Sequence, residues 1–78
     1  MQLEIITPEQ TIYSGQVNLV QLPGIDGSFE VLNDHAPLIS VLGVGRIKVQ
    51  DASKQLLYFE IKDGVVEVLF NKILVLAE

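Results

Sequence analysis

The sequence predicts an all-β protein, a small antiparallel β-sandwich of two packed sheets. Two observations lead to this prediction. The chain divides into short apolar or alternating segments bounded by Gly, Pro, Asn and Asp, a pattern typical of strands joined by turns. No uninterrupted stretch shows the roughly 3.6-residue period of a helix. Because 78 residues are enough for one domain only, the strands are expected to form a single sandwich or barrel.

The expected strands share an apolar or alternating pattern and a turn signal at one or both ends. They comprise residues 2–7, 12–14, 16–22, 46–50, 56–62, 65–70 and 73–77. The first of them stops before Pro8, and the third stops at Pro23-Gly24, a pair that favours a turn. The apolar residues of the third strand change faces half-way along it, so a β-bulge or burial on both faces is expected there.

The second half of the chain reads as hairpins. Residues 46–50 and 56–62 alternate between apolar and polar side chains, and the polar turn 51–55 separates them. Asp63-Gly64 is a typical two-residue hairpin loop, so it predicts that the strands on either side of it pair. Asn71-Lys72 predicts another hairpin between the last two strands.

Some leucines of the last strands lie on faces that a free-standing sandwich leaves to polar residues. They are Leu56, Leu69, Leu74 and Leu76. The residues expected in the core, on the opposite faces, are Leu57, Val68, Phe70, Ile73 and Val75. Surplus apolar surface on a small domain indicates an interface with another protein. The alternative, that the register differs and the leucines are core residues, stays open at this stage.

Charge and composition exclude several function classes. The net charge is −5, and the charged residues among residues 1–45 are all Asp or Glu, without any Lys or Arg. Nucleic acid is therefore a poor partner, because phosphate binding needs clustered Lys and Arg; a basic protein surface is a better one, and simple solubility also explains the charge. The chain has no cysteine for disulfides or thiolate zinc sites. It also has no apolar run of about 20 residues and no signal-like start, so a soluble chain without an export address is expected.

The residues that invite a chemical role have simpler explanations. His35 is the only histidine, but its neighbour Asp34 points to the opposite face of an extended segment and cannot orient it as in a catalytic triad. One histidine among scattered carboxylates is also a weak metal signal. Gly24 and Gly27 are not followed by the lysine and the helix start that a phosphate-binding loop needs. We therefore expect no catalytic, cofactor-binding or metal-binding residue.

Lys54 is the one candidate attachment site. A lysine at a hairpin tip is how a swinging-arm carrier presents its prosthetic group, although the usual flanking acid and hydrophobe are missing here. A solvated turn lysine is the simpler interpretation. A stand-alone β-sandwich that binds a partner, or that carries a group on this lysine, remains the alternative function.

The segment "LPGIDGSFEVLNDHAPLISVLGVGRIKV", residues 22–49, resembles the ε subunit of the F-type ATP synthase, called δ in mitochondria. Its most specific element is His35-Ala36-Pro37-Leu38. The opening "LEIITPEQTIYSGQV" and the closing "DGVVEVLFNKILVLAE" are also similar to this family, so the resemblance covers nearly the whole chain.

The chain departs from the family pattern in three places and at its end. The family often has an acid, then Phe or Leu, then Gly where Ser28, Phe29 and Glu30 stand; Pro is common at Asn33, and Gly-Gly at Asp63-Gly64. Many members continue into a C-terminal helical hairpin, whereas this sequence stops at Glu78 and is either a natural short form or the N-terminal domain of a longer chain. We therefore expect one domain, residues 1–78, in which inhibition by an extending helix and nucleotide binding by that region are missing.

The resemblance implies a non-catalytic rotor subunit of the central stalk, without a cofactor. It would bind the γ subunit and seat on the c-ring, coupling proton translocation to ATP synthesis. It would lie at the cytoplasmic face of the bacterial inner membrane, peripheral to it. The positions that match γ contacts are Thr7, His35, Ala36, Pro37, Leu38 and Ser40. An acidic loop is expected to be solvated and to face a basic residue of the c-ring; it comprises Asp26, Gly27, Ser28 and Glu30.

Overall fold

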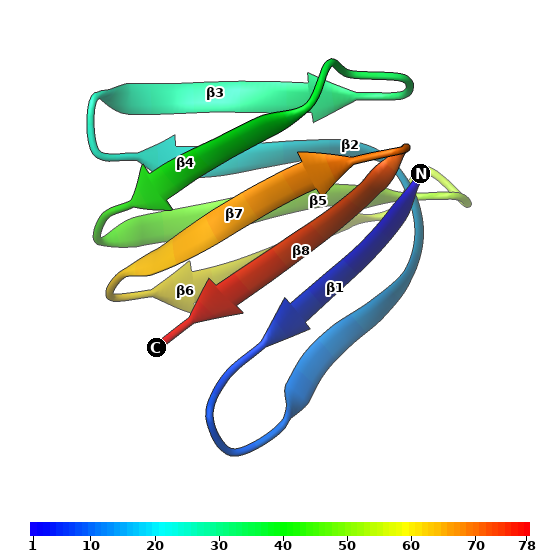
Figure 1. Ribbon diagram of the computed structural model, residues 1–78. Coiled ribbons are helices and arrows are strands. Elements are labelled where there is room, and N and C mark those ends of the chain that lie inside the picture. Colours follow the sequence, from blue (N-terminus) through cyan, green and yellow to red (C-terminus); the bar gives the residue numbers. More distant parts are fainter.

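The computed structural model describes residues 1–78, and all of its regular structure is β-strand (Figure 1). The strands are β1 (Gln2–Ile6), β2 (Thr11–Gly24), β3 (Gly27–Leu32), β4 (Leu38–Leu42), β5 (Gly45–Asp51), β6 (Leu56–Ile61), β7 (Gly64–Leu69) and β8 (Lys72–Ala77). The chain contains no helix of the length and apolarity needed to cross a membrane.

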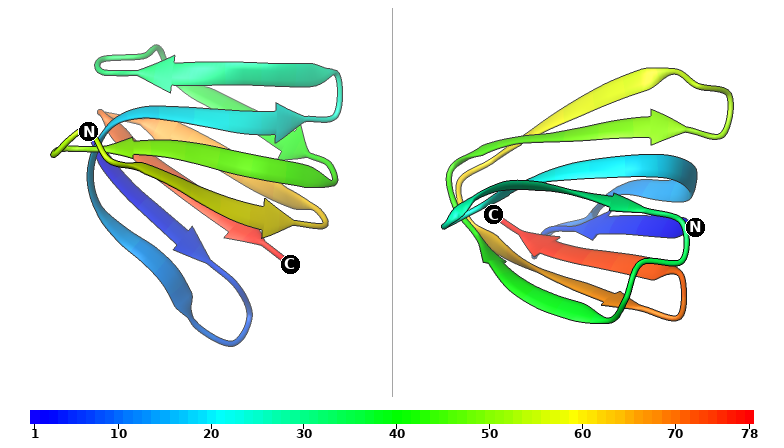
Figure 2. Two further views of the ribbon diagram at one scale, coloured as in Figure 1. Left: turned by 180° about the vertical axis from the view of Figure 1, so that it is seen from behind. Right: turned by 90° about the horizontal axis from the view of Figure 1, so that it is seen from above.

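The strands form two layers that pack face to face (Figure 2). The first sheet has the order β4-β7-β8-β1 and is extended by the first half of β2. The second sheet has the order β3-β2-β5-β6 and uses the second half of β2. All pairs are antiparallel except β1–β8, which is parallel. The predicted two-sheet β-sandwich is therefore confirmed.

Strand β2 links the two sheets because it is long and bulged. It has 14 residues and joins two segments that the sequence predicts as separate strands, since Gly15 does not interrupt it. Its pairing with β5 shifts register between Val17 and Leu19, which confirms the expected bulge. The bulge brings both Val17 and Val20 to the inner face, where both are buried.

The hairpin predicted at Asp63-Gly64 is wrong. Strand β6 pairs only with β5, whereas β7 pairs with β4 and β8, so this connection crosses from the second sheet to the first. Gly64 does not adopt the positive φ that a type I′ loop needs. It is required for a different reason: a Cβ at this position would lie 2.6 Å from the backbone oxygen of Leu76 on the neighbouring strand β8.

We expect Gly64→Ala to destabilise the fold by about 1–3 kcal/mol, because the atom that the new methyl group meets is backbone and cannot rotate away. Chemical denaturation measures the change. Gly43→Ala is the matched control, since a Cβ there meets only the Ile25 side chain at 3.6 Å, an ordinary contact. Equal stability of the two variants would contradict the close approach of β8 to Gly64.

The last hairpin is confirmed, with its loop one residue earlier than predicted. Leu69 pairs with Lys72, so the two loop residues are Phe70 and Asn71. Their φ angles are 50° and 59°, which is the pattern of a type I′ turn. Phe70 therefore lies outside the strand. The prediction that it belongs to the core is wrong, because its side chain is 85% exposed.

Two further strands lie outside those expected from periodicity. Strand β3 pairs with β2 through a tight turn, and β4 pairs with β7 along its whole length. Between the two sheets lies a core of 16 buried residues, all of them hydrophobic. It includes Val68, Ile73 and Val75 as predicted, and Leu57 packs against it while partly exposed. Each sheet thus has an inner face that is already filled, which leaves the outer faces for function.

Candidate protein-protein interface

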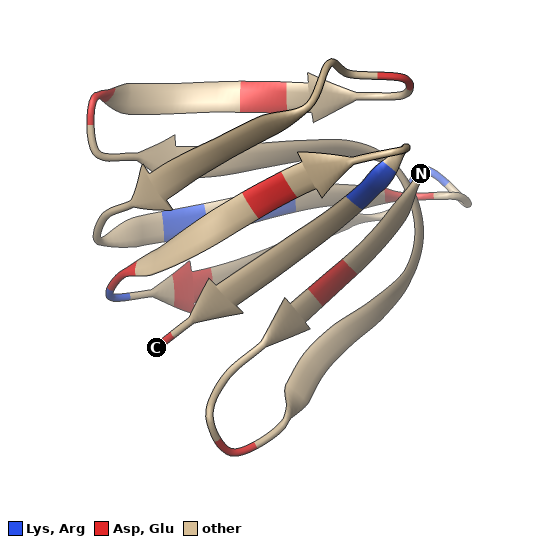
Figure 3. Cartoon of the chain, viewed as in Figure 1, with Lys and Arg blue, Asp and Glu red and all other residues tan.

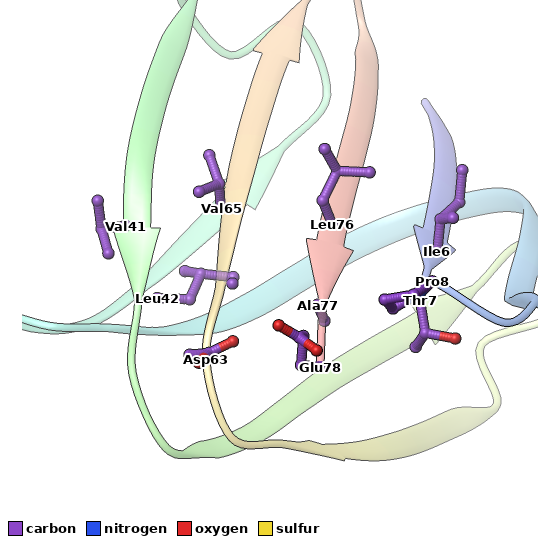
Figure 4. A pocket seen from close by; sticks show the side chains of 11 residues that line it. Ile6, Thr7, Pro8, Val41, Leu42, Asp63, Val65, Leu76, Ala77 and Glu78 are labelled. Atoms are coloured by element: carbon purple, nitrogen blue, oxygen red, sulfur yellow. The ribbon is translucent and has the colours of Figure 1, made fainter.

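The outer face of the first sheet is largely apolar. Its apolar residues alternate with the core residues along each strand, and we call them together the apolar face. They are Ile6, Ile39, Val41, Val65, Leu69, Leu74 and Leu76. Cross-strand pairing places Val41, Val65, Leu76 and Ile6 side by side in one row across β4, β7, β8 and β1 (Figure 4). This face comes from four different strands, so only the fold assembles it.

The structure resolves the alternatives for the surplus leucines. Leu69, Leu74 and Leu76 all lie on the apolar face, and none of them is a core residue. Leu56 is also 49% exposed, but it belongs to β6 and lies on the outer face of the second sheet. A different register is therefore not the explanation. Surface of this kind on a small domain is typical of an interface.

A groove deepens the apolar face at the end where β4 and β8 finish. It has a volume of about 640 Å³, and its walls include the row described above, with Pro8 at one side (Figure 4). Asp63 and Glu78 lie at its lower edge. Gly64 contributes no side chain there. The groove therefore combines apolar walls with an acidic rim.

The outer face of the second sheet differs from the apolar face because it carries both basic and acidic side chains. Arg46 pairs across strands with Glu60, and its guanidinium carbon lies 4.5 Å from the centre of the Tyr58 ring. Such a cation–π contact leaves the cation less dependent on an outside partner. By contrast, β4 has no charged residue, and β1, β7 and β8 have one each (Figure 3).

The predicted acidic loop is only partly a loop. Asp26 lies in the turn between β2 and β3, but Gly27, Ser28 and Glu30 belong to β3. Glu30 pairs with Gln21 of β2, so its assignment to the loop is wrong. The turn between β2 and β3 contains only two residues, Ile25 and Asp26, and ends at Gly27, whose φ is 127°. Asp26 is therefore the only acid in the turn. All four residues are exposed, so the expected solvation of Asp26 and Glu30 is confirmed.

The Asp26 turn is held in place by the neighbouring connection. The Ile25 N–H donates to the Val41 carbonyl oxygen at 3.2 Å, and the Gly43 N–H donates to the Pro23 carbonyl oxygen at 2.8 Å. Ile25 precedes this acid in the turn, Val44 follows Gly43 in the neighbouring connection, and both aliphatic side chains are exposed. The end of the sandwich at which β2 turns into β3 therefore presents an ordered acidic turn and exposed aliphatic side chains.

The structure does not bring the predicted γ-contacting residues together. Thr7 lies just after β1, where its hydroxyl donates to the Gln10 carbonyl oxygen at 3.1 Å. His35 lies at the opposite end of the sandwich, because the adjacent backbone N–H of Asp34 donates to Asn71 Oδ1 in the β7–β8 loop. Ser40 is in the middle of β4 and pairs with the buried Val66, so it faces inward and is partly exposed.

The segment that follows His35 leads into β4. His35, Ala36 and Pro37 are exposed, whereas Leu38 starts the strand and packs against the core. The His35 Nδ1 lies 2.7 Å from the Ala36 carbonyl oxygen, so this ring nitrogen is the donor. The imidazole thus has a backbone partner within its own loop, and no group of three or more His, Cys, Asp or Glu residues is placed to hold a metal ion.

Lys54 lies in the turn between β5 and β6, as predicted. It is exposed and has a φ of 69°, and the Asp51 carboxylate orders the turn by accepting hydrogen bonds from the Ser53 and Gln55 N–H groups, both at 2.9 Å. An aspartate that accepts from backbone N–H groups further along a turn is a common turn device. The geometry of this lysine is therefore explained by the turn itself.

Four members of the apolar face are not predicted from the sequence: Ile6, Ile39, Val41 and Val65. A signal for three of them was present, since "LISVL" and "VVEV" place apolar residues on both faces of a strand. Central strands covered on both sides have this pattern. Which of the two apolar sets faces outward depends on the pairing of β4 with β7, and that pairing is not local in sequence.

Comparison with known proteins decides the family. The family described as the β-sandwich domain of the ATP synthase delta/epsilon chain matches this chain over residues 1–78. The chain belongs to this family. The resemblance noted from His35-Ala36-Pro37-Leu38 is thereby confirmed.

Individual family members span different lengths. The ATP synthase epsilon chain of Chlorobium limicola is 38% identical, with 99% of this chain and 88% of the relative covered. That of Salinibacter ruber is also 38% identical over the whole chain, but the chain spans only 58% of it. That of Lawsonia intracellularis is 42% identical, and again 58% of the relative is covered. The chain thus spans most of one epsilon relative and just over half of the others.

Two solved structures share the delta/epsilon fold. A chain in the mitochondrial ATP synthase of Euglena gracilis, solved with its F1 part and c-ring, superposes with a TM-score of 0.87 over 96% of this chain and 48% of that one. A chain in the central stalk and c-ring of the Tetrahymena thermophila mitochondrial enzyme gives 0.80 over 99% and 62%. Their sequence identities are 16% and 18%, so these likenesses concern the fold alone.

Proposed function

We propose that this chain is a non-catalytic rotor subunit in the central stalk of a proton-translocating ATP synthase. In this role it binds the γ subunit, seats on the c-ring and transmits torque between them. The observation that supports the proposal most strongly is the apolar face, because a free-standing sandwich has no use for seven apolar residues on an outer face. Family membership supports the ATP synthase as the complex that provides a partner for that face.

The γ subunit is the partner that covers the apolar face. The row of Val41, Val65, Leu76 and Ile6 gives a continuous apolar strip across the first sheet, and the groove beside it offers a recess for a side chain of the partner. Apolar centres of this kind dominate the binding energy of protein interfaces. Asp63 and Glu78 at the groove edge favour a basic residue of the partner at the rim.

The c-ring meets the end of the sandwich that presents Asp26. A basic residue in the polar loop of the ring complements this acid, and Ile25 and Val44 supply apolar contact around it. An exposed charge pair of this kind sets orientation and rate of assembly more than affinity. The subunit is accordingly peripheral, at the cytoplasmic face of the bacterial inner membrane, and is held there through the complex.

Co-purification tests the proposal directly. The chain, carrying an affinity tag, is expressed together with the γ subunit and the c-ring of its complex, and the purified material is analysed by mass spectrometry. We expect both partners to be recovered in constant proportion to the chain. Recovery of the chain without γ would contradict the rotor assignment, and a covalent group on Lys54 would favour the carrier alternative.

Neutralising Asp26 is expected to weaken seating on the ring modestly. For Asp26→Asn we predict a two- to fivefold rise, on the order of what an exposed ion pair contributes, in the dissociation constant for the detergent-solubilised c-ring with γ bound. The effect should be largest at low salt and shrink as salt screens the pair. Glu30→Gln is the matched control, because it removes the same charge from the second sheet rather than from the turn. An Asp26→Asn effect that is independent of salt would remove the electrostatic part of the proposal.

A further inference from the structure

Phe70 stands at a backbone position that suits other residues better. It is the first loop residue of the type I′ turn between β7 and β8, with a φ of 50°. Such a position favours Asn, Asp or Gly, because a larger side chain crowds the backbone in the left-handed region. The second loop residue, Asn71, fits this rule.

Asn71 also has a clear structural role in the turn. Its Oδ1 accepts a hydrogen bond from the Asp34 N–H at 2.8 Å, and its carbonyl oxygen accepts one from the Gln2 N–H at 3.1 Å. The loop is thus fixed to the start of β1 and to the segment before His35. This anchoring holds the turn rigid and sets the direction in which the neighbouring Phe70 projects.

Packing within the chain does not explain Phe70. Its side chain is 85% exposed, more than any other large hydrophobic side chain of the protein. A bulky residue in the left-handed region lowers stability, and an exposed ring recovers almost none of that loss by burial. Strained positions that the fold itself does not reward are found mostly at functional sites.

The surroundings of Phe70 connect it to the apolar face. With Leu69 and Leu74 it lines a hollow of about 350 Å³, whose polar members are Gln2, Glu4, Glu67 and Lys72. Leu69 and Leu74 belong to the apolar face, so Phe70 extends that face to the end of the sandwich where His35 lies. The ring therefore stands at the corner between the sheet and the His35 segment.

We propose that Phe70 is an anchor residue, which inserts its ring into an apolar pocket of the γ subunit. This inference rests on the proposed function and adds the residue that dominates the interface at this end of the sheet. Aromatic side chains bury a large area with few rotatable bonds. Because Asn71 fixes the turn, little further freedom is lost when γ binds.

The proposal predicts opposite changes in stability and in binding for one substitution. Phe70→Asn relieves the backbone strain, so the midpoint of thermal unfolding should rise by about 2–5 °C. The same variant should bind the purified γ subunit at least about tenfold more weakly, as loss of an aromatic anchor does. Leu56→Asn is the matched control: Leu56 is 49% exposed, but it lies on the outer face of the second sheet and should leave γ binding unchanged.

Three outcomes would overturn the proposal. A Phe70→Asn chain that binds γ as tightly as the wild type shows that the ring is no anchor. A lower unfolding midpoint shows that Phe70 is kept for packing. An equal loss of binding in Leu56→Asn shows that any exposed apolar side chain contributes. Absence of γ binding by the wild-type chain is a different result, because it refutes the proposed function itself.

Discussion

Shortening Leu22 to alanine is expected to lower the free energy of unfolding by about 2–5 kcal/mol. Leu22 is fully buried and lies on β2, the strand that both sheets share. It pairs with Phe29 of β3, which packs against the core, and it neighbours the point where Gly24 pairs with Leu42 of β4. A cavity at this junction is hard to fill, because neighbours from both sheets would have to move together.

That loss is large for a domain of this size. A 78-residue chain has a total stability of about 4–12 kcal/mol at the usual density per residue. The unfolding midpoint of Leu22→Ala should therefore fall by at least about 10 °C, which calorimetry measures. Leu56→Ala is the control: the same atoms are removed from a side chain that is 49% exposed, so stability should change by less than about 0.5 kcal/mol. Equal shifts in both variants would contradict the assignment of inner and outer faces.

The parts of the fold that the sequence predicts are those fixed by local patterns. The β5–β6 hairpin follows from strict alternation around a polar turn, and the bulge in β2 follows from apolar residues that change faces. The β7–β8 hairpin is also local, although its turn lies one residue earlier than predicted. In both hairpins the partner strand lies within a few positions, and the bulge is visible within β2 itself, so local side-chain patterns predict these features.

The parts that the sequence does not predict depend on distant pairing. Strand β8 pairs in parallel with β1, at the other end of the chain, and this pairing draws β7 away from β6 and turns Asp63-Gly64 into a crossing. The dipeptide has the composition of a hairpin loop, but tertiary pairing overrides it. Glu30 is misplaced for another reason: β2 continues through Pro23 and Gly24, and its hairpin with β3 leaves only Ile25 and Asp26 in the turn.

The candidate interface was partly visible in the sequence. Surplus leucines on β7 and β8 indicate an apolar outer surface, and three of the four predicted leucines do lie on the apolar face. The remaining members come from β1, β4 and β7, and their register against β8 decides that they form one row. Leu56 has the same pattern yet lies on the other sheet. Periodicity identifies which residues face outward, but only the topology decides which of them share a face.

If the γ subunit covers the apolar face as proposed, a glutamate in place of Leu76 should strongly weaken γ binding while leaving the fold intact. Leu76 is 51% exposed and lies on β8 between Val65 of β7 and Ile6 of β1, in the middle of the apolar row. In the free chain the new carboxylate remains in water, so stability should change by less than about 1 kcal/mol. In the complex the carboxylate would lose its water among aliphatic side chains without a cation to pair with, which costs several kcal/mol.

We therefore expect Leu76→Glu to weaken γ binding by about 100-fold or more, equivalent to about 2.7 kcal/mol, in a calorimetric titration. Leu56→Glu is the decisive comparison. It introduces the same charge on a leucine of nearly the same exposure, but on the second sheet, and should leave the affinity within about twofold. If both variants bind alike, γ does not cover the first sheet. If only Leu56→Glu loses binding, the second sheet is the interface, and the apolar face requires another partner.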